Sequence, residues 1–330
     1  MDPDRPSAER VPDRAIPARH DVGNDFLMSS SRLGYLYAIL AVTIFASQDG
    51  ISKYLGEQYP PVFIAMIRYF AFAGFAVLLA ARAPGGLRVA SHSRRFWIQC
   101  FRSLLLALQI VVAIQAFAVV GLIQSQAIFA SAPIFVALLS MPVLGERVGW
   151  RRWLAIVVGL VGVVILLNPG AVGEAAGGFG WSTAWPLAGA LMMGAYAVTT
   201  RLAGRDDSSI TSFYYTGIVG MLVLTAIGPF FLASPTPGDW VWIGILCMTG
   251  MSSHFLLIKA YEHLDAVAVQ PIGYLQLVVG AFIGVFVFGE SLHLNLVLGA
   301  GIVIAAGAFT VWREHVVARR KLAEAKSGSS

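Results

Sequence analysis

Five charged residues lie inside long apolar stretches of the sequence, where a charge is costly: Asp49, Lys53, Arg68, Arg102 and Lys259. A charge at the centre of a bilayer costs at least about 2.5–3.5 kcal/mol, so retained charges usually face a bundle interior or a water-filled cavity. Asp49 and Lys53 are four residues apart, the spacing of an ion pair on one helical face. Such a pair either holds its helix in place or contributes to a ligand site, and the sequence leaves both open. Asp49 is also the candidate group for coupling to a proton or another ion.

Arg68 and Arg102 each lie about two helical turns inside an apolar stretch, so their long side chains can reach the membrane surface. For Arg102 this snorkelling is the favoured interpretation. Arg68 lies near the external end of its apolar stretch, on the side of the membrane where no other Lys or Arg is found, and this favours a ligand-binding or pairing role. Lys259 is interpreted as a charge that sets topology.

Several glutamines form the second polar signal, because hydrocarbon cannot satisfy their amide groups. Hydrogen bonding between helices would explain any one of them. Together they predict a polar, largely uncharged cavity, and Gln126, Gln270 and Gln276, with the neighbouring Tyr274, are the candidates for ligand contact. The candidate substrate-binding set is Asp49, Lys53, Arg68, Arg102, Gln126, Gln270, Tyr274 and Gln276.

The sequence lacks the residue patterns that metal-binding, nucleotide-hydrolysing or nucleic-acid-binding sites require. Cys100 and Cys247 are far apart, and the polar group at His254, Glu262, His263 and Asp265 has no HExxH spacing and is explained by interfacial solvation. A phosphate-binding GxxxxGK[ST] motif is absent, which disfavours ATP hydrolysis. We therefore expect no catalytic residues, cofactor or metal. The net charge of +5 is not clustered as a nucleic-acid site requires.

The elements that must position these residues are membrane helices, since 57% of the 330 residues are hydrophobic and only 12% are charged. A bilayer core of about 30 Å needs roughly 20 apolar residues per helix. The sequence predicts ten spans: Leu33–Tyr54, Pro61–Ala81, Phe96–Val119, Leu122–Leu144, Trp150–Leu167, Trp181–Thr200, Ile210–Leu232, Trp240–Lys259, Val267–Phe288 and Leu294–Trp312.

The eight tryptophans fall at the ends of these spans, as interfacial residues do. All but four of the 23 Lys and Arg lie in tails or on one side, which the positive-inside rule makes cytoplasmic. We expect a multi-pass protein of the inner membrane with both termini in the cytoplasm. The tails, residues 1–32 and 313–330, are expected to be disordered.

An internal repeat relates residues 144 apart: Gln126 corresponds to Gln270, and Gly145-Glu146 to Gly289-Glu290. Because each half, residues 33–167 and 181–312, holds five spans, the copies must have opposite orientations in the membrane. The expected fold class is therefore an all-α membrane protein of ten transmembrane helices in two inverted five-helix repeats.

Local signals refine this outline. Pro133 and Pro271 each allow a kink in the fourth and ninth spans. Gly280 and Gly284 form a GxxxG close-packing signal. Glu290, and its counterpart Glu146, are interpreted as charges at the N-terminus of the span that follows each.

The Leu144-Gly145-Glu146 and Phe288-Gly289-Glu290 turns resemble those that end each repeat in the EamA-type drug/metabolite transporter superfamily. The stretch from Asp49 to Leu55, Arg68, Arg102, Lys259-Ala260-Tyr261, Asp265-Ala266 and Tyr274-Leu275 resemble a subgroup that takes up S-adenosylmethionine and riboflavin. One departure is that Pro133 and Pro271 have no proline at the equivalent position of the other half.

The resemblance implies secondary transport of a small molecule by alternating access, with the substrate between spans one, two, three, four, eight and nine. A neutral or positive interior disfavours a strongly cationic ligand, so an uncharged heteroaromatic compound such as riboflavin is expected, with S-adenosylmethionine as the alternative. An exporter of amino acids or drugs on the same scaffold is the first rival. A membrane-embedded enzyme is the remote one.

Overall fold

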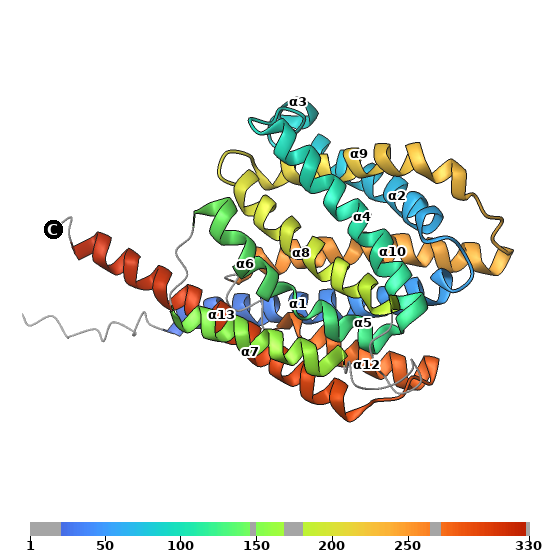
Figure 1. The fold of residues 1–330 in the computed structure, drawn as a ribbon. Coiled ribbons are helices and arrows are strands. Elements are labelled where there is room, and N and C mark those ends of the chain that lie inside the picture. The colour runs from blue at the N-terminus through green and yellow to red at the C-terminus, as the bar shows by residue number, and fades with distance from the viewer. Residues whose placement is uncertain (1–20, 146–149, 168–180, 265–271, 328–330) are drawn as a thin grey trace, which may run out of the picture.

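The computed structural model describes residues 21–145, 150–167, 181–264 and 272–327, and the regular structure within these ranges is helical (Figure 1). Six helical segments are long and apolar enough to cross a membrane: Arg32–Gly56, Pro61–Arg82, Phe96–Val120, Leu122–Leu144, Ser209–Phe231 and Pro237–Ala260. Shorter apolar helical segments cover Trp153–Ile165, Leu275–Phe288 and Leu294–Ala306. The chain is therefore a multi-pass membrane protein.

The elements follow one another along the chain without a strand in the described residues. The first half contains α1 (Asp21–Gly56), α2 (Pro61–Arg82), α3 (Gly86–Ala90), α4 (Phe96–Val120), α5 (Leu122–Phe129), α6 (Ala132–Leu144) and α7 (Trp150–Leu167). The second half contains η2 (Trp181–Thr183), α8 (Ala184–Ala203), α9 (Ser209–Ile227), η3 (Gly228–Phe231), α10 (Pro237–His263), α12 (Leu275–Phe288) and α13 (Leu294–Ser327).

The two terminal helices are longer than the hydropathy predicts. α1 begins at Asp21 and α13 continues to Ser327, so both helices extend into the tails that the sequence predicts to be disordered. The segment after Trp312 is rich in Ala, Arg, Lys, Glu and Leu, which are strong helix formers and extend a helix beyond its apolar part. Hydropathy marks where a helix can lie in lipid and does not mark where it ends.

The fourth expected span is broken into two helices. α5 ends at Phe129, the chain turns at Ala130–Ser131, and α6 begins at Ala132 with Pro133 in its first turn. The kink expected from Pro133 is thereby confirmed. A turn at Tyr274 precedes α12 at the position equivalent to Ala130, whereas Pro271 lies outside the described residues.

The ends of α6 and α12 also share a backbone conformation. Gly145 and Gly289, which are equivalent in the repeat, have φ values of 70° and 65° and terminate their helices in the left-handed region. Only glycine adopts this conformation without strain, so it ends a helix readily. The repeat detected in the sequence thus appears in local structure at two places.

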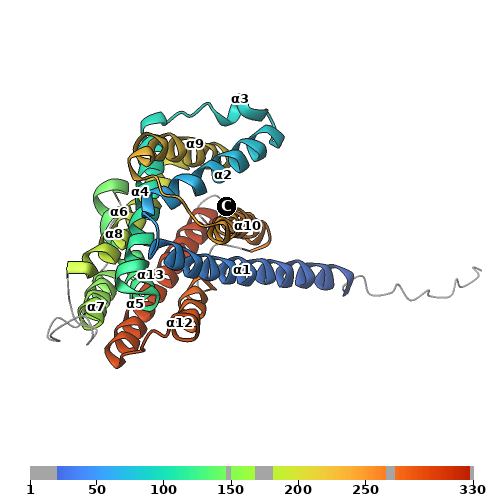
Figure 2. The ribbon, with the colours of Figure 1, turned by 90° about the vertical axis from the view of Figure 1, so that its right-hand side faces the viewer.

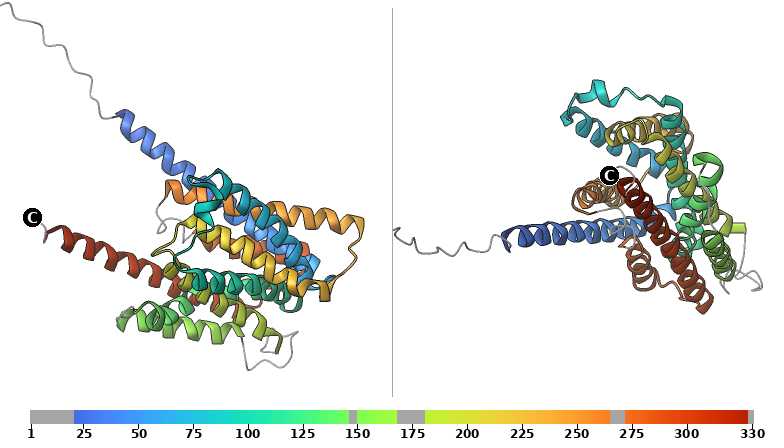
Figure 3. Two further views of the ribbon diagram at one scale, coloured as in Figure 1. Left: turned by 90° about the horizontal axis from the view of Figure 1, so that it is seen from above. Right: turned by 90° about the vertical axis from the view of Figure 1, so that its left-hand side faces the viewer.

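Helices from the two halves are neighbours in space. α1 packs against α10, α2 against α9, α4 against α8, and α7 against α13 (Figures 1 and 2). α5 contacts α12. The extended ends of α1 and α13 project from the bundle on the same side, as the view from above shows (Figure 3).

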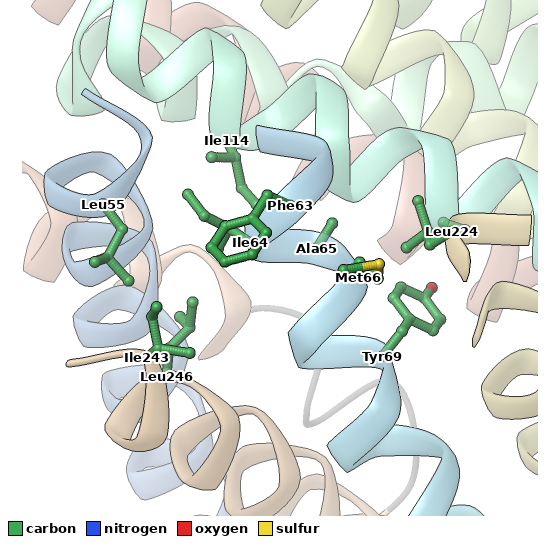
Figure 4. Packing of buried hydrophobic residues seen from close by; sticks show 11 residues of the cluster. Leu55, Phe63, Ile64, Ala65, Met66, Tyr69, Ile114, Leu224, Ile243 and Leu246 are labelled. Atoms are coloured by element: carbon green, nitrogen blue, oxygen red, sulfur yellow. The ribbon is translucent and has the colours of Figure 1, made fainter. Parts of the chain in front are cut away.

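The largest buried cluster lies where α2 meets α1, α4, α9 and α10 (Figure 4). Its fully enclosed side chains include Leu55, Ile64 and Ile114, and Tyr69 lies beside Met66 on the side facing Leu224. The outer surface also carries many large apolar side chains, as expected of helices in lipid. All eight tryptophans are exposed, and all except Trp312, which lies inside the long α13, are in the first turns of helical segments.

Candidate functional site

Asp49 on α1 joins three helices through one carboxylate oxygen. Its Oδ2 accepts hydrogen bonds from Gln126 Nε2 on α5 at 3.1 Å and from Gln276 Nε2 on α12 at 2.7 Å. Amide donors can satisfy a carboxylate inside a membrane without a second charge. Three residues of the predicted set, Asp49, Gln126 and Gln276, therefore lie together, and we call them the Asp49 cluster.

Glycines on α12 create the space for this cluster. A Cβ at Gly280 would collide with Gln126 Oε1, and one at Gly284 would collide with the Ile123 side chain. The close packing predicted from the GxxxG signal is thus confirmed, and the helix that packs against these two glycines is α5, while α12 also packs against α1. Gln126 Oε1 is buried and has no hydrogen-bond partner among the described residues.

Lys53 does not pair with Asp49, so that expectation is wrong. Its Nζ lies 2.7 Å from Glu57 Oε1 and 3.3 Å from Glu290 Oε1, and 5.0 Å from the centre of the Phe288 ring. The helical spacing allows Lys53 to pair with either Asp49 or Glu57. Lys53 pairs with Glu57 because Glu290, just after α12, also approaches it, whereas the Asp49 carboxylate is hydrogen-bonded to two amides.

Glu290 caps a helix in the other half of the chain. Its two carboxylate oxygens accept from the backbone N–H groups of Leu122 at 2.7 Å and Ile123 at 2.8 Å, the first residues of α5. A carboxylate at a helix N-terminus satisfies free N–H groups and complements the helix dipole. The expectation that Glu290 serves the following span is corrected: it serves α5. A glycine just before α5 is the sequence signal for this contact. Gly121 has a φ of 100°, and a Cβ there would lie 3.1 Å from Glu290 Oε1.

Arg102 is a structural residue in this arrangement. Its side chain is 3% exposed and donates to Gln99 Oε1 at 2.7 Å, the Ser212 carbonyl at 2.9 Å, Tyr196 Oη at 3.0 Å and Thr200 Oγ1 at 3.1 Å. The favoured snorkelling interpretation is therefore wrong, because α8 and α9 cover the guanidinium. Its donors tie α4 to both helices.

The loop between α8 and α9 continues this network outside the membrane. Asp207 accepts from Ser93 Oγ at 2.5 Å, Gln99 Nε2 at 2.9 Å and the Arg94 backbone N–H at 2.9 Å, and Asp206 pairs with Arg95. Burial alone would raise the pKa of the Asp207 carboxyl, but these hydrogen bonds outweigh it and hold that pKa below its ordinary value. The loop therefore stabilises the ionised carboxylate of Asp207.

Arg68 on α2 lies in a separate cavity between α2, α4 and α10. Its guanidinium makes no hydrogen bond or ion pair with any residue that the structure describes, and its charge interacts with that of Asp49 without contact. The cavity, which we call the Arg68 cavity, is lined by Arg68, Tyr69, Phe72, Leu106, Ile110, Cys247, Gly250, Met251 and His254.

His254 was not expected here. Its Nδ1 lies 2.8 Å from the Gly250 carbonyl oxygen, and its ring packs edge-on against Phe45, Phe72 and Phe213. The interpretation as interfacial solvation is corrected, since the ring lies in the Arg68 cavity. Its spacing of four from Gly250, which places both on one face of α10, was the available signal.

The remaining members of the predicted set are less informative. Tyr274 is half-buried at the turn before α12, two residues from Gln276, and Gln270 lies outside the described residues. The described residues contain no group of His, Cys, Asp and Glu arranged to hold a metal ion.

Comparison with known proteins places this geometry in context. The profile of the EamA-like transporter family matches residues 32–168 and 180–312. An S-adenosylmethionine uptake transporter of Rickettsia bellii is 28% identical over 91% of this chain and 100% of its own length. A riboflavin transporter of Vibrio cholerae is 29% identical over 87% of this chain and 96% of its own.

A solved crystal structure shares the fold. It superposes with a TM-score of 0.54 at 18% identity and covers 89% of this chain and 98% of its own. At this level of identity, the likeness bears on the fold alone.

Proposed function

Because the chain belongs to the EamA-like transporter family, we propose that it is a secondary transporter that takes up a small organic metabolite with a flat heteroaromatic ring. Riboflavin is the first compound to test and S-adenosylmethionine the second, because relatives of nearly full coverage carry those names. The fold is a membrane bundle with polar groups in its interior, as a transporter of a polar solute requires.

Alternating access between two inverted five-helix halves is the mechanism that we propose. In this mechanism the five helices of the first half, α1, α2, α4, α5–α6 and α7, correspond in order to α8, α9, α10, α12 and α13. The contact of α1 with α10 then corresponds to the contact of α8 with α4. The contacts of α2 with α9, α7 with α13 and α5 with α12 then map onto themselves. The observed pairs follow this exchange, which supports a two-fold relation lying in the membrane plane.

The proposed orientation places both termini in the cytoplasm of a cell bounded by an inner membrane. Arg82, Arg88, Arg94 and Arg95 then face the cytoplasm with the loop before α9. The segment between α9 and α10 and the turn at Glu290 face outward and carry no Lys or Arg. The positive-inside rule supports this choice.

The observation that carries the proposal is that polar groups inside the bundle lie where the halves meet. The Asp49 cluster draws on α1 and α5 from the first half and α12 from the second, and the Arg68 cavity on α2, α4 and α10. Groups at such a boundary change their surroundings when the halves move. We propose that Asp49, Arg68, Gln126 and Gln276 contact the substrate.

Neighbouring residues have supporting roles in this proposal. We propose that Tyr274, at the turn before α12, also contacts the substrate, and Gln270 is proposed from the sequence alone because it lies outside the described residues. Lys53 and Arg102 hold helices in register. Asp49 is also the group that we propose for coupling to a proton, since it is the carboxylate of the cluster.

Uptake into proteoliposomes tests the function. Purified protein is expected to give saturable uptake of labelled riboflavin or S-adenosylmethionine that Asp49→Asn and Gln276→Ala reduce by about ten-fold, the effect of about 1.4 kcal/mol. Gln58→Ala, at an exposed position in the turn after α1, is the control and retains uptake. An imposed pH gradient should change the rate in the wild type and not in Asp49→Asn. Wild-type rates in both folded variants would refute the Asp49 site.

A further inference from the structure

The two arginines inside the bundle differ in their partners. Arg102 makes four hydrogen bonds, whereas Arg68 makes none with the described residues. Arg68 is half-buried, it keeps its proton, and its five N–H donors have no partner among the described residues. Arg68 therefore has the charge and the free donors that a ligand can use, and Arg102 does not.

Two further polar groups beside Arg68 also lack partners. Gln48 Oε1 and the Tyr69 hydroxyl are buried and make no hydrogen bond among the described residues. Gln48 is 3% exposed and Tyr69 is 2% exposed, so neither meets bulk water. Each unpaired buried group costs about 1–3 kcal/mol, so each has hydrogen-bonding capacity that a ligand can use.

Gly250 on α10 lies next to two of these residues, Gln48 and Arg68. A Cβ at this position would lie 3.0 Å from Gln48 Oε1, 3.6 Å from Arg68 Nε and 4.0 Å from Arg68 Nη2. The absence of a side chain at residue 250 thus leaves space between the amide of Gln48 and the guanidinium of Arg68. A ligand atom placed there would lie close to both groups.

Aromatic rings form the wall next to that space. Phe72 lies 5.9 Å from Tyr69, 5.4 Å from His254 and 4.8 Å from Phe213, measured between ring centres. Such rings bind a flat heteroaromatic group by stacking or edge contacts. The free space in the cavity is about 20 Å³, room for one water molecule, so a metabolite enters only when the helices that line it move apart.

We infer that Arg68 forms a subsite for an anionic oxygen group, a carboxylate or a phosphate, of the transported metabolite, in which Gln48 Oε1 accepts a hydrogen bond from an N–H or O–H of the same ligand and Gly250 leaves space for both. The planar guanidinium donates two parallel hydrogen bonds to such a group, and the rings beside it receive the rest of the molecule. This inference rests on the proposed function and deepens it. It replaces the expectation of an uncharged substrate with that of an acidic or zwitterionic one.

Competition between matched compounds tests the subsite. Affinity is measured with purified protein and in proteoliposomes for S-adenosylmethionine against its decarboxylated analogue, and for riboflavin 5′-phosphate against riboflavin. In the wild type, the anionic member of at least one pair is expected to bind about ten-fold more tightly. The first pair reports a carboxylate and the second a phosphate.

Two substitutions locate the effect. Arg68→Gln should abolish the preference, so that both members of a pair bind with the same affinity, and Arg68→Lys should retain part of the preference. Gly250→Ala should weaken binding of the anionic member, because its methyl group fills the space between Gln48 and Arg68. Gly244→Ala on the same helix meets nothing within 4 Å and is the matched control.

The outcomes separate the two proposals. Equal affinity for both members of each pair in a wild type that transports them overturns the anionic subsite and leaves transport standing. An equal loss for both members in Arg68→Gln and Gly250→Ala also overturns it, since that is what a packing role predicts. Absence of saturable uptake and binding for all four compounds overturns the proposed function, and the subsite with it.

Discussion

Lys53 lies between two carboxylates that differ in exposure. The side chain of Glu57 is 42% exposed and that of Glu290 is 16% exposed. Exposed ion pairs one helical turn apart contribute little, because water screens them and ordering the side chains costs entropy. Glu290 has the additional task of capping α5, so the same charge has a larger effect there.

Replacement of each carboxylate by its amide should separate these roles. Glu290→Gln is expected to lower the free energy of unfolding by about 1–3 kcal/mol, because the amide leaves the N–H groups of Leu122 or Ile123 and the Lys53 charge without a full partner. Glu57→Gln should change it by no more than about 0.5 kcal/mol. Thermal denaturation of the purified variants in one detergent measures both, and equal effects would argue against the cap.

The contact between α5 and α12 depends on small residues. Gly280 accepts the Gln126 side chain, and this places the amide of Gln126 against Asp49. The glycine at position 280 of α12 therefore sets the position of Gln126 in the Asp49 cluster. A substitution that changes the packing of α12 against α5 will also change this cluster.

Alanine at Gly280 should displace Gln126. The added methyl group would lie 2.5 Å from Gln126 Cδ, and such overpacking costs about 1–3 kcal/mol. We expect lower thermal stability and reduced uptake. Gly301→Ala on α13 meets nothing within 4 Å and should leave stability unchanged or raise it by up to about 1 kcal/mol. If the two variants behaved alike, Gly280 would not be in close contact with Gln126.

The link between the start of α4 and the loop before α9 should respond to acid. Because the pKa of Asp207 is lower in the folded protein than its ordinary value of 3.8, its stabilising effect is complete above about pH 4 and is lost as the pH falls through the folded pKa. The difference in melting temperature between the wild type and Asp207→Asn should therefore be constant from about pH 5 to 8 and shrink below about pH 4. A difference that varied within the neutral range would contradict this assignment.

At the scale of the whole molecule, the pairing of helices across the halves has consequences for topology. The projecting ends of α1 and α13 lie on the same side, and helices that exchange under the repeat make equivalent contacts. An arrangement of this kind requires the segment between α9 and α10 to face away from both chain ends.

Labelling of single cysteines measures this topology. In a background with Cys100 and Cys247 replaced by alanine, Ser234→Cys should react in intact cells with a membrane-impermeant maleimide, whereas His92→Cys should react only after permeabilisation. Both positions are exposed, so accessibility within the fold does not bias the comparison. The opposite pattern would invert the proposed orientation, and reaction at both positions would refute the assignment of sides.

The sequence alone determined the properties that each segment has with respect to lipid. Apolar stretches, tryptophans at helix ends and the placing of Lys and Arg follow from the transfer of individual residues between water and hydrocarbon, and this needs no knowledge of neighbours. The same holds for local turns, since the left-handed helix ends at Gly145 and Gly289 depend on glycine itself.

Only the tertiary structure decided which partners the buried polar groups have. Asp49 and Lys53 are neighbours on one helix, yet one binds amides from α5 and α12 and the other binds Glu290. The sequence favoured snorkelling for Arg102, but its guanidinium is saturated by hydrogen bonds inside the bundle, whereas Arg68 has no hydrogen-bond or ion-pair partner among the described residues. The reason is physical: hydrogen bonds act over about 3 Å, so their partners depend on which helices meet, and residues far apart in the chain decide that.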